Sequence, residues 1–328
     1  MSGAAKGPGS RPEAAGPVRT AAVIGTGVIG LGWTTLFLAH GLDVRVNSRR
    51  DDAEQAVRDG VGLFAATLPA GPADPEELLT RLTVEPDVER AVAGADVVQE
   101  NLREDLAAKR ELFARVERAA PGHALLLSSA SSLGVDDMGA DMADPARLMV
   151  GHPFNPSHLV PLVEIVPGGR TDPDLVTRAA DFYRSLGKTP VAVRRPLRGT
   201  PANRLQSALF REAVHLVLEG ILTVDELDAV VTGSLGLRWG AIGPFRAFHL
   251  GGGPGGLRRM LEAVGPKMAR EWQHLGTPDL DGPAVELLAE QAQEAYGSGK
   301  HAYERLAAER DARQAAVLRA LRAAEDPA

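Results

Sequence analysis

The sequence predicts an α/β domain with a doubly wound sheet, followed by an all-helical domain. Up to Val193, short apolar runs alternate with helical segments, as they do when crossover helices join parallel strands. A glycine-rich turn separates the first apolar run from the first helix. From Asn203 onward the pattern is helical only, so the whole sheet is expected in the first domain.

Strands are predicted from short runs rich in Val, Ile, Leu and Ala, and helices from apolar residues at helical spacing. The predicted strands span residues 20–24, 43–47, 82–84, 95–99, 124–128, 147–151, 161–166 and 190–193. The predicted helices span residues 31–40, 52–68, 105–119, 173–186, 203–220, 224–232, 257–273, 284–297 and 301–324. The glycine-rich stretches 233–245 and 249–256 are expected to be a loop and a chain break.

Composition changes mark the boundaries of the two domains. Residues 1–18 are small, polar and rich in Pro and Gly, and we expect them to form a disordered lead-in. The run Arg194–Pro201 has the composition of a linker, which separates a first domain of residues 19–197 from a second of residues 198–328.

The overall composition is that of a soluble globular protein. The chain of 328 residues is 44% hydrophobic and has a net charge of −7, so nucleic acid and anionic membranes are not expected as partners. The chain has no cysteine, which excludes disulfides and thiolate-zinc sites. No apolar run approaches the ~20 residues that cross a bilayer, and no secretory signal is visible. We expect a cytoplasmic protein without a metal.

A dinucleotide site is predicted from the sequence Gly-Thr-Gly-Val-Ile-Gly, which begins at Gly25 between the first strand and helix. Gly25 allows a tight turn, Gly27 lets a pyrophosphate approach the backbone, and Gly30 allows close packing of helix and strand. Val28 and Ile29 lie in this turn, before the predicted helix, whose free N-terminal N–H groups and dipole favour an anion. This arrangement is typical of a Rossmann-type domain.

The end of the second strand indicates which dinucleotide is preferred. NAD sites usually carry an acid there to hold the ribose 2′-hydroxyl. This sequence has Ser48 at that position, followed by Arg49 and Arg50. A hydroxyl and guanidinium groups would bind a 2′-phosphate, which an acid would repel. We expect NADP(H) to be preferred. The alternative is NAD(H), with the two arginines as solvated loop charges.

Two residues twelve positions apart form a candidate acid–base pair. His152 directly follows the predicted strand 147–151, and Glu164 lies within the predicted strand 161–166. If these strands are neighbours, the carboxylate can hold one imidazole nitrogen and leave the other to move a proton. The alternative is a hydrogen-bonded histidine at a strand end with no chemical role.

Several of these stretches together carry a family resemblance. They are VIGTGVIG, ENLREDLAAKRELF, SSASSL, GHPFNPSHLVPLVEI and TPANRL. In combination they resemble the 3-hydroxyacyl-CoA dehydrogenase superfamily over about residues 19–300. The segment GLRWGAIGPFRAFHLGGGPGG is similar to the branch of carnitine and gulonate dehydrogenases, one of which also serves as a lens crystallin.

The resemblance implies roles for particular residues. It makes the histidine–glutamate pair catalytic, and it assigns Ser131 and Asn203 to contact with the substrate oxygen. It assigns Glu104 and Lys109 to contact with the cofactor. It also implies a helical C-terminal domain that binds substrate and forms a homodimer.

The leading functional hypothesis is an NADPH-dependent ketoreductase that interconverts 3-hydroxy and 3-oxo groups. Residues 60–77 contain no Lys or Arg, where acyl-CoA enzymes of this superfamily have a lysine-rich helix, so a small carboxylic or polyketide-type substrate is expected. Because some members of the superfamily act on polyketides, we place this reaction in antibiotic biosynthesis.

Three alternatives differ from that hypothesis. One is a catabolic NAD-dependent dehydrogenase of the carnitine, gulonate or 3-hydroxyacyl-CoA type. A second is a crystallin-like protein that binds a nucleotide without turning anything over. A metal-dependent hydrolase is set aside, because no two of the eight histidines have helical i, i+4 spacing.

Overall fold

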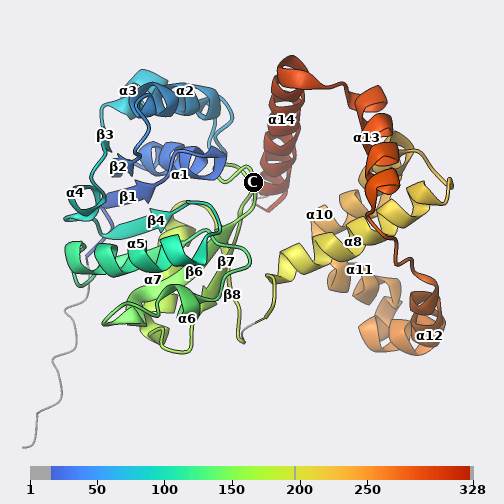
Figure 1. Ribbon diagram of the computed structural model, residues 1–328. Helices are drawn as coiled ribbons and strands as arrows, with labels where there is room; N and C mark the ends of the chain where they lie inside the picture. The colour runs from blue at the N-terminus through green and yellow to red at the C-terminus, as the bar shows by residue number, and fades with distance from the viewer. Residues whose placement is uncertain (1–15, 196, 326–328) are drawn as a thin grey trace, which may run out of the picture. The chain divides into compact units, whose positions relative to one another are not determined.

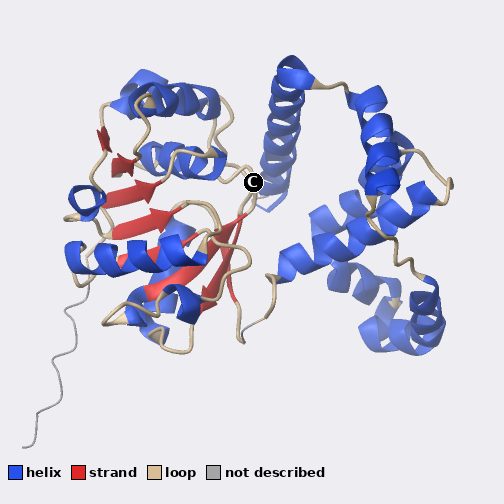
Figure 2. Cartoon of the chain, viewed as in Figure 1, coloured by secondary structure: helices blue, strands red, loops and turns tan. Residues whose placement is uncertain are grey.

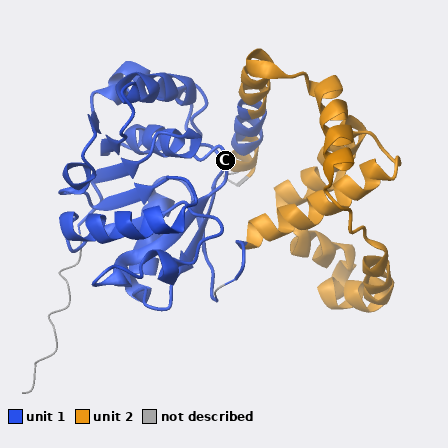
Figure 3. Ribbon diagram, viewed as in Figure 1, with its two compact units in different colours: residues 1–200, 311–319 blue, residues 201–310, 320–328 orange. Residues whose placement is uncertain are grey.

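The computed structural model describes residues 16–195 and 197–325. Most of the predicted lead-in therefore lies outside the described residues. The chain divides into two compact units, one containing the residues up to Thr200 together with Asp311–Arg319, and the other containing Pro201–Arg310 and the C-terminal end. Figure 3 shows that the last helix contributes to both units. The domain boundaries predicted from the sequence instead place that whole helix in the second domain.

The first unit is built on one eight-stranded sheet with strand order β3-β2-β1-β4-β5-β6-β7-β8, whose strands are drawn as arrows in Figure 1. All neighbouring strands are parallel except β6 and β7, which are antiparallel. The strands are β1 Thr20–Ile24, β2 Asp43–Asn47, β3 Leu82–Glu85, β4 Val97–Glu100, β5 Leu125–Ser128, β6 Leu148–Pro153, β7 Leu162–Pro167 and β8 Thr189–Ala192.

Helices cover both faces of this sheet, which explains why β1, β4 and β5 are almost entirely buried and contain apolar runs. One face packs against α1 (Val28–Ala39), α2 (Ala53–Ala65) and α7 (Pro173–Ser185). The other packs against α4 (Val88–Val92), α5 (Leu106–Ala119) and α6 (Val135–Met138). The predicted Rossmann-type fold is therefore confirmed.

Short polar residues fix where many of these helices begin. Aspartates accept hydrogen bonds from backbone N–H groups of the first turn, which have no partner within the helix. These N-caps are Asp74 for α3 (Pro75–Leu79), Asp87 for α4, Asp105 for α5 and Asp172 for α7. The helices α3, α4 and α6 were not predicted, because four or five residues are too short to show helical periodicity.

A cluster of aromatic rings supports the strand that carries His152. Tyr183 of α7 is buried and packs against Trp33, with ring centroids 5.5 Å apart. Its hydroxyl donates a hydrogen bond of 2.8 Å to Gln99. A Cβ atom at Gly151 would lie only 2.0 Å from that hydroxyl. Glycine is therefore required beside the histidine, since any side chain would push β6 off α7.

The second unit is helical, as predicted (Figure 2). Its helices are α8 Pro201–Leu218, α9 Val224–Val231, α10 Leu237–Ile242, α11 Pro244–Gly251, α12 Gly256–Glu271, α13 Gly282–Tyr296 and the parts of α14 (Gly299–Glu325) outside Asp311–Arg319. No helix within residues 16–195 and 197–325 is long and apolar enough to cross a membrane.

The expected loop at residues 233–245 is a mistake in the prediction. A π-helical turn at Thr232–Gly236 leads into α10, and α11 follows directly. The glycines of residues 233–245 lower helix propensity, but at one of these positions the packing of the backbone favours glycine. A Cβ at Gly236 would lie 2.8 Å from the Val231 carbonyl oxygen, so the π-helical turn favours glycine there. At Gly243, φ is +70° and the helix is interrupted.

Candidate active site

The glycine-rich turn has the geometry that a dinucleotide pyrophosphate requires. Gly25 has a φ of +99°, which favours glycine. A Cβ at Gly30 would lie 2.1 Å from the Gly25 carbonyl oxygen, so turn and helix can approach only with glycine there. A Cβ at Gly27 would have no atom within 4 Å. The space beside the N-terminus of α1 is therefore open, and the turn fits a pyrophosphate.

A cavity of about 560 Å³ adjoins this turn and contains the predicted specificity residues. Ser48 is buried, and its hydroxyl lies 3.2 Å from the Thr26 hydroxyl. Arg49 and Arg50 are exposed at the rim. Arg50 forms a bidentate pair with Asp52, at 2.6 and 2.8 Å. Thr26 was not singled out by the sequence analysis, although it lies inside the glycine motif.

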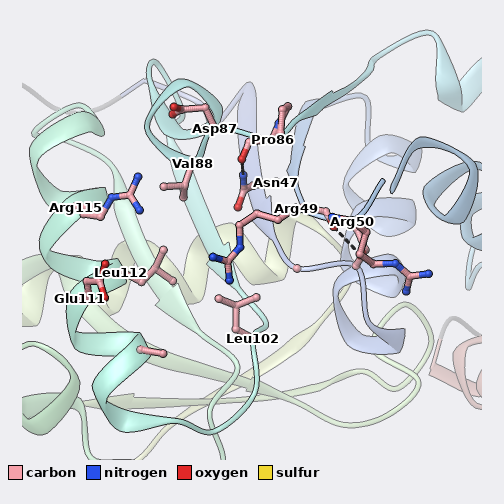
Figure 4. A pocket seen from close by; sticks show the side chains of 14 residues that line it. Asn47, Arg49, Arg50, Pro86, Asp87, Val88, Leu102, Glu111, Leu112 and Arg115 are labelled. Atoms are coloured by element: carbon pink, nitrogen blue, oxygen red, sulfur yellow. Dashed lines mark hydrogen bonds between the residues drawn. The ribbon is translucent and has the colours of Figure 1, made fainter. Parts of the chain in front are cut away.

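The remaining walls of the cavity come from β-strand ends and α5. Figure 4 shows Val88, Leu102 and Leu112 there, with the Arg115 side chain above Leu112. Arg115 forms an ion pair of 3.1 Å with Glu89. The apolar lining residues are Val88, Leu102, Ala108 and Leu112. An apolar slot beside the glycine turn suits a planar base such as adenine.

His152 and Glu164 meet as the sequence predicted. They are register partners in the antiparallel pair β6–β7, and His152 Nδ1 lies 3.1 Å from Glu164 Oε2. Only 7% of His152 and 2% of Glu164 is exposed. The hydrogen bond needs a proton on Nδ1 when the carboxylate is ionised, so Nε2 of the neutral ring is free to accept a proton. The Phe154 ring packs edge-on against His152, with centroids 5.4 Å apart.

The loop that follows His152 is joined to α1 by a hydrogen bond. The Ser157 hydroxyl donates a hydrogen bond of 2.8 Å to the Ile29 carbonyl in the first turn of α1. A Cβ at Gly32 would lie 2.3 Å from the Ser157 hydroxyl oxygen. One residue further, His158 Nε2 lies 2.9 Å from the Thr67 hydroxyl. These hydrogen bonds could not be predicted from the sequence, because they join residues far apart in the chain.

Glu104 and Ser131 are close together, on the loops after β4 and β5. The Ser131 hydroxyl donates to Glu104 Oε1 at 2.7 Å, and the Ser132 backbone N–H donates to the same oxygen at 3.1 Å. The Ser131 N–H and the Ser132 hydroxyl also donate to this carboxylate. Partial burial by itself would raise the pKa of Glu104, but the hydrogen bonds from Ser132 and Ser131 outweigh it and lower the pKa.

Lys109 lies in the interior, where it forms part of a polar network that the sequence analysis missed. Its ammonium group is 2.5 Å from Glu100 Oε1 and also donates to the Leu102 carbonyl. The Ser128 hydroxyl donates to Glu100 Oε2 at 2.6 Å. Lys109 and Glu100 are 1% and 0% exposed. The structure thus places Lys109 beneath the loop that carries Glu104, and its contact with a cofactor stays a prediction.

Asn203, the last predicted substrate contact, is half-buried in α8 of the second unit, whereas Ser131, His152 and Glu164 belong to the first. The roles of these four residues toward a substrate stay predictions.

Residues 16–195 and 197–325 contain no group of three or more His, Cys, Asp or Glu side chains that could hold a metal ion.

Two family profiles match the chain in succession. Residues 20–196 match the profile described as "3-hydroxyacyl-CoA dehydrogenase, NAD binding domain". Residues 199–277 match the profile described as "3-hydroxyacyl-CoA dehydrogenase, C-terminal domain". The two matches meet near the division between the two compact units.

Individual relatives are similar over nearly the whole chain. An L-carnitine dehydrogenase from Streptomyces griseus is 44% identical over 313 residues, covering 94% of this chain and 92% of the relative. Another from Nocardiopsis dassonvillei is 41% identical, with 96% and 94% covered. Among solved structures, an NAD+-dependent 5-formyl-3-hydroxy-2-methylpyridine 4-carboxylic acid 5-dehydrogenase aligns with a TM-score of 0.73 at 25% identity, covering 93% of this chain and 99% of the other.

Proposed function

Because the chain belongs to the 3-hydroxyacyl-CoA dehydrogenase family, we propose that it interconverts the 3-hydroxy and 3-oxo forms of a small acid of the carnitine type. The enzyme class is that of the family and its relatives, an oxidoreductase acting on CH–OH groups. His152 is the proposed acid–base group. The buried hydrogen bond between His152 and Glu164 is the observation that carries the proposal.

The chemistry follows from the protonation states of this pair. In the oxidative direction, neutral His152 accepts the hydroxyl proton of the substrate on Nε2. Glu164 holds the ring in orientation and stabilises the imidazolium that forms. A bound nicotinamide dinucleotide supplies the hydride acceptor. The substrate carbon loses a hydride and its oxygen loses a proton, which leaves a ketone.

We propose that Ser131 assists by accepting a hydrogen bond from the substrate. Its own proton points to Glu104, so the oxygen lone pairs remain for the substrate hydroxyl. In this role Ser131 orients the alcohol toward His152. The proposed contact of Asn203 with the substrate oxygen rests on the family resemblance.

The relatives support the catabolic alternative more than the biosynthetic ketoreductase that the sequence analysis ranked first. Both curated relatives are named L-carnitine dehydrogenase, and neither name refers to a polyketide. A second candidate, NADPH-dependent reduction of a 3-oxo compound, is favoured by one observation. Ser48 and Arg49 line the cavity where an acid would select NAD(H), and we keep NADP(H) as the proposed preferred cofactor.

A second copy of the chain is the proposed partner. The second unit exposes large apolar side chains, and no residue of α9, α10 or α11 is buried. Exposed fractions are 61% for Phe210, 70% for Leu237 and 78% for Phe245. Apolar exposure on this scale usually marks an interface. Sedimentation should give twice the monomer mass, and Phe210→Glu should shift the mass toward the monomer.

The test of the function is a substrate comparison with a catalytic control. Oxidation of L-carnitine, L-gulonate and 3-hydroxybutyryl-CoA is followed with NAD+ and with NADP+. The proposal expects the highest kcat/KM with carnitine or a similar free acid, and loss of that rate in His152→Asn with retained cofactor binding. Equal rates in the two proteins would contradict the role of His152, and a preference for the CoA thioester would contradict the substrate class.

A further inference from the structure

Arg49 and Arg50 are neighbours in the chain, but their side chains take opposite directions. In Figure 4, Arg49 extends across the cavity toward the side where Leu102 and Leu112 lie. Arg50 extends the other way, and its Nε and Nη2 atoms donate to the two carboxylate oxygens of Asp52. A bidentate pair of this kind already uses the fork geometry with which arginine binds phosphate.

Hydroxyl groups line the cavity next to Arg49. The Ser48 hydroxyl lies 3.2 Å from that of Thr26 and accepts a hydrogen bond from the Arg50 backbone N–H at 3.4 Å. The hydroxyls of Ser48 and Thr26 lie where the end of β2 meets the glycine turn. In a dinucleotide bound on that turn, the adenosine ribose occupies this corner.

The charge balance of the cavity also points to Arg49. Three guanidinium groups line it, on Arg49, Arg50 and Arg115, and two carboxylates, on Asp87 and Glu111. The Asp87 carboxylate accepts backbone N–H groups at the start of α4. Arg115 is paired with Glu89. Among these three arginines, Arg49 is the one with no ion pair in the described residues.

We propose that Arg49 is the specificity residue of this site, binding a phosphate on the ribose 2′-oxygen while its guanidinium lies over the adenine. Ser48 and Thr26 would supply hydroxyl donors to the same phosphate. This assignment rests on the proposed use of a nicotinamide dinucleotide. The sequence predicted that both Arg49 and Arg50 bind the phosphate. The proposal assigns this role to Arg49 alone, because the ion pair with Asp52 directs Arg50 away from the phosphate.

This arrangement gives a preference rather than an exclusion. When the bound dinucleotide has no 2′-phosphate, the Arg49 guanidinium stays exposed to water. Binding free energy is not lost there, since no buried charge is left unpaired. A charge-assisted hydrogen bond pair would strengthen binding of the phosphorylated cofactor roughly ten- to a hundredfold. Because Arg49 is exposed, added salt should reduce that ratio.

The experiment compares two fragments that differ only in the 2′-phosphate. Adenosine 2′,5′-bisphosphate and 5′-AMP are titrated by calorimetry against the full-length protein and the variants Arg49→Ala, Arg50→Ala, Arg115→Ala and Ser48→Asp. The wild type should bind the bisphosphate at least tenfold more tightly. Arg49→Ala and Ser48→Asp should bring the ratio near one, and the two charge-matched controls, Arg50→Ala and Arg115→Ala, should keep it. Retained binding of 5′-AMP shows that each variant has an intact site.

Two outcomes would overturn the assignment. One is equal binding of both fragments by the wild type, and the other is loss of the ratio in Arg50→Ala but not in Arg49→Ala. These failures are separate from failure of the proposed function. An enzyme that oxidises a 3-hydroxy acid through His152 but binds both fragments equally keeps the function and loses the phosphate site. A protein with the fragment preference and no turnover keeps the site and loses the function.

Discussion

His152 and Glu164 face each other directly across the β6–β7 pair, with 3.1 Å between Nδ1 and Oε2. The contact depends on register, because side chains alternate between the two faces of a sheet. A slip of one residue in either strand would place the carboxylate on the opposite face from the imidazole. The antiparallel turn-back between β6 and β7 thus sets the acid–base geometry within a short stretch of chain.

Removal of either member of this pair should separate the two roles. His152→Asn keeps a polar side chain but cannot carry a proton, and kcat should fall about 10²- to 10⁴-fold. Glu164→Gln keeps the shape but not the charge that stabilises the imidazolium, so kcat should fall with little change in cofactor affinity. Steady-state kinetics and cofactor titration measure both. Wild-type kcat in Glu164→Gln would show that the carboxylate is only a packing partner.

The buried ion pair of Lys109 with Glu100 should be far more important for stability than its exposed neighbour. Lys109→Met leaves Glu100 charged in the interior, and the free energy of unfolding should fall by about 3–5 kcal/mol. Arg110→Met removes a surface pair with Asp141, whose side chain is 52% exposed, and should cost less than about 1 kcal/mol. Urea unfolding of the two variants measures the difference. Similar losses in both would contradict the buried network.

Gly32 should be intolerant of a methyl group, unlike a helical glycine with open surroundings. Gly32→Ala brings a Cβ to 2.3 Å from the Ser157 hydroxyl oxygen, and overpacking of this kind costs about 1–3 kcal/mol. Because Ser157 fastens the loop after His152, we also expect kcat to fall.

Two further variants test whether the cause is that contact. Gly62 of α2 has no atom within 4 Å of its added Cβ, so Gly62→Ala should stabilise the protein by about 0.5–1 kcal/mol. Adding Ser157→Ala to Gly32→Ala should recover part of both losses. No recovery would mean that the methyl group acts elsewhere, for example against the His158 backbone, 3.1 Å away.

Glu104 should make stability depend on pH in the acid range. Its pKa in the folded protein is lowered from 4.5, so the carboxylate holds Ser131 and Ser132 more strongly than its protonated form does. That stabilisation is fully present above about pH 4.5 and is lost as the pH falls through the lower folded pKa. The difference in unfolding free energy between wild type and Glu104→Gln should therefore shrink on acidification. A difference that stays constant would rule out this carboxylate as the titrating group.

The sequence predicted those features that depend on local patterns. Strand bounds such as Thr20–Ile24 and Asp43–Asn47 agree with the structure because buried parallel strands are short apolar runs bounded by turns. The pairing of His152 with Glu164 followed once the two runs were taken as neighbours. The glycine turn was recognisable because each glycine has a separate steric reason.

Other features could not be predicted, because they depend on packing between distant segments. Nothing near Lys109 in the chain shows that Glu100 would bind it in the interior rather than leave it for a cofactor. The Arg50 side chain is directed by its ion pair with Asp52, two residues away. The sequence alone does not distinguish this ion pair from an Arg50 that binds a phosphate. The helices within residues 233–245 were hidden by glycines, which lower helix propensity, although the segment forms a π-helical turn and α10.

The glycine turn, His152 and Glu164 all lie before Thr200, in the first compact unit. The two halves of the chain can therefore evolve at different rates. Substitutions after Pro201 leave the glycine turn and the hydrogen-bonded pair of His152 and Glu164 unaltered. Under the proposed function, substrate contacts made by the second unit can therefore diverge while the proposed acid–base pair is kept.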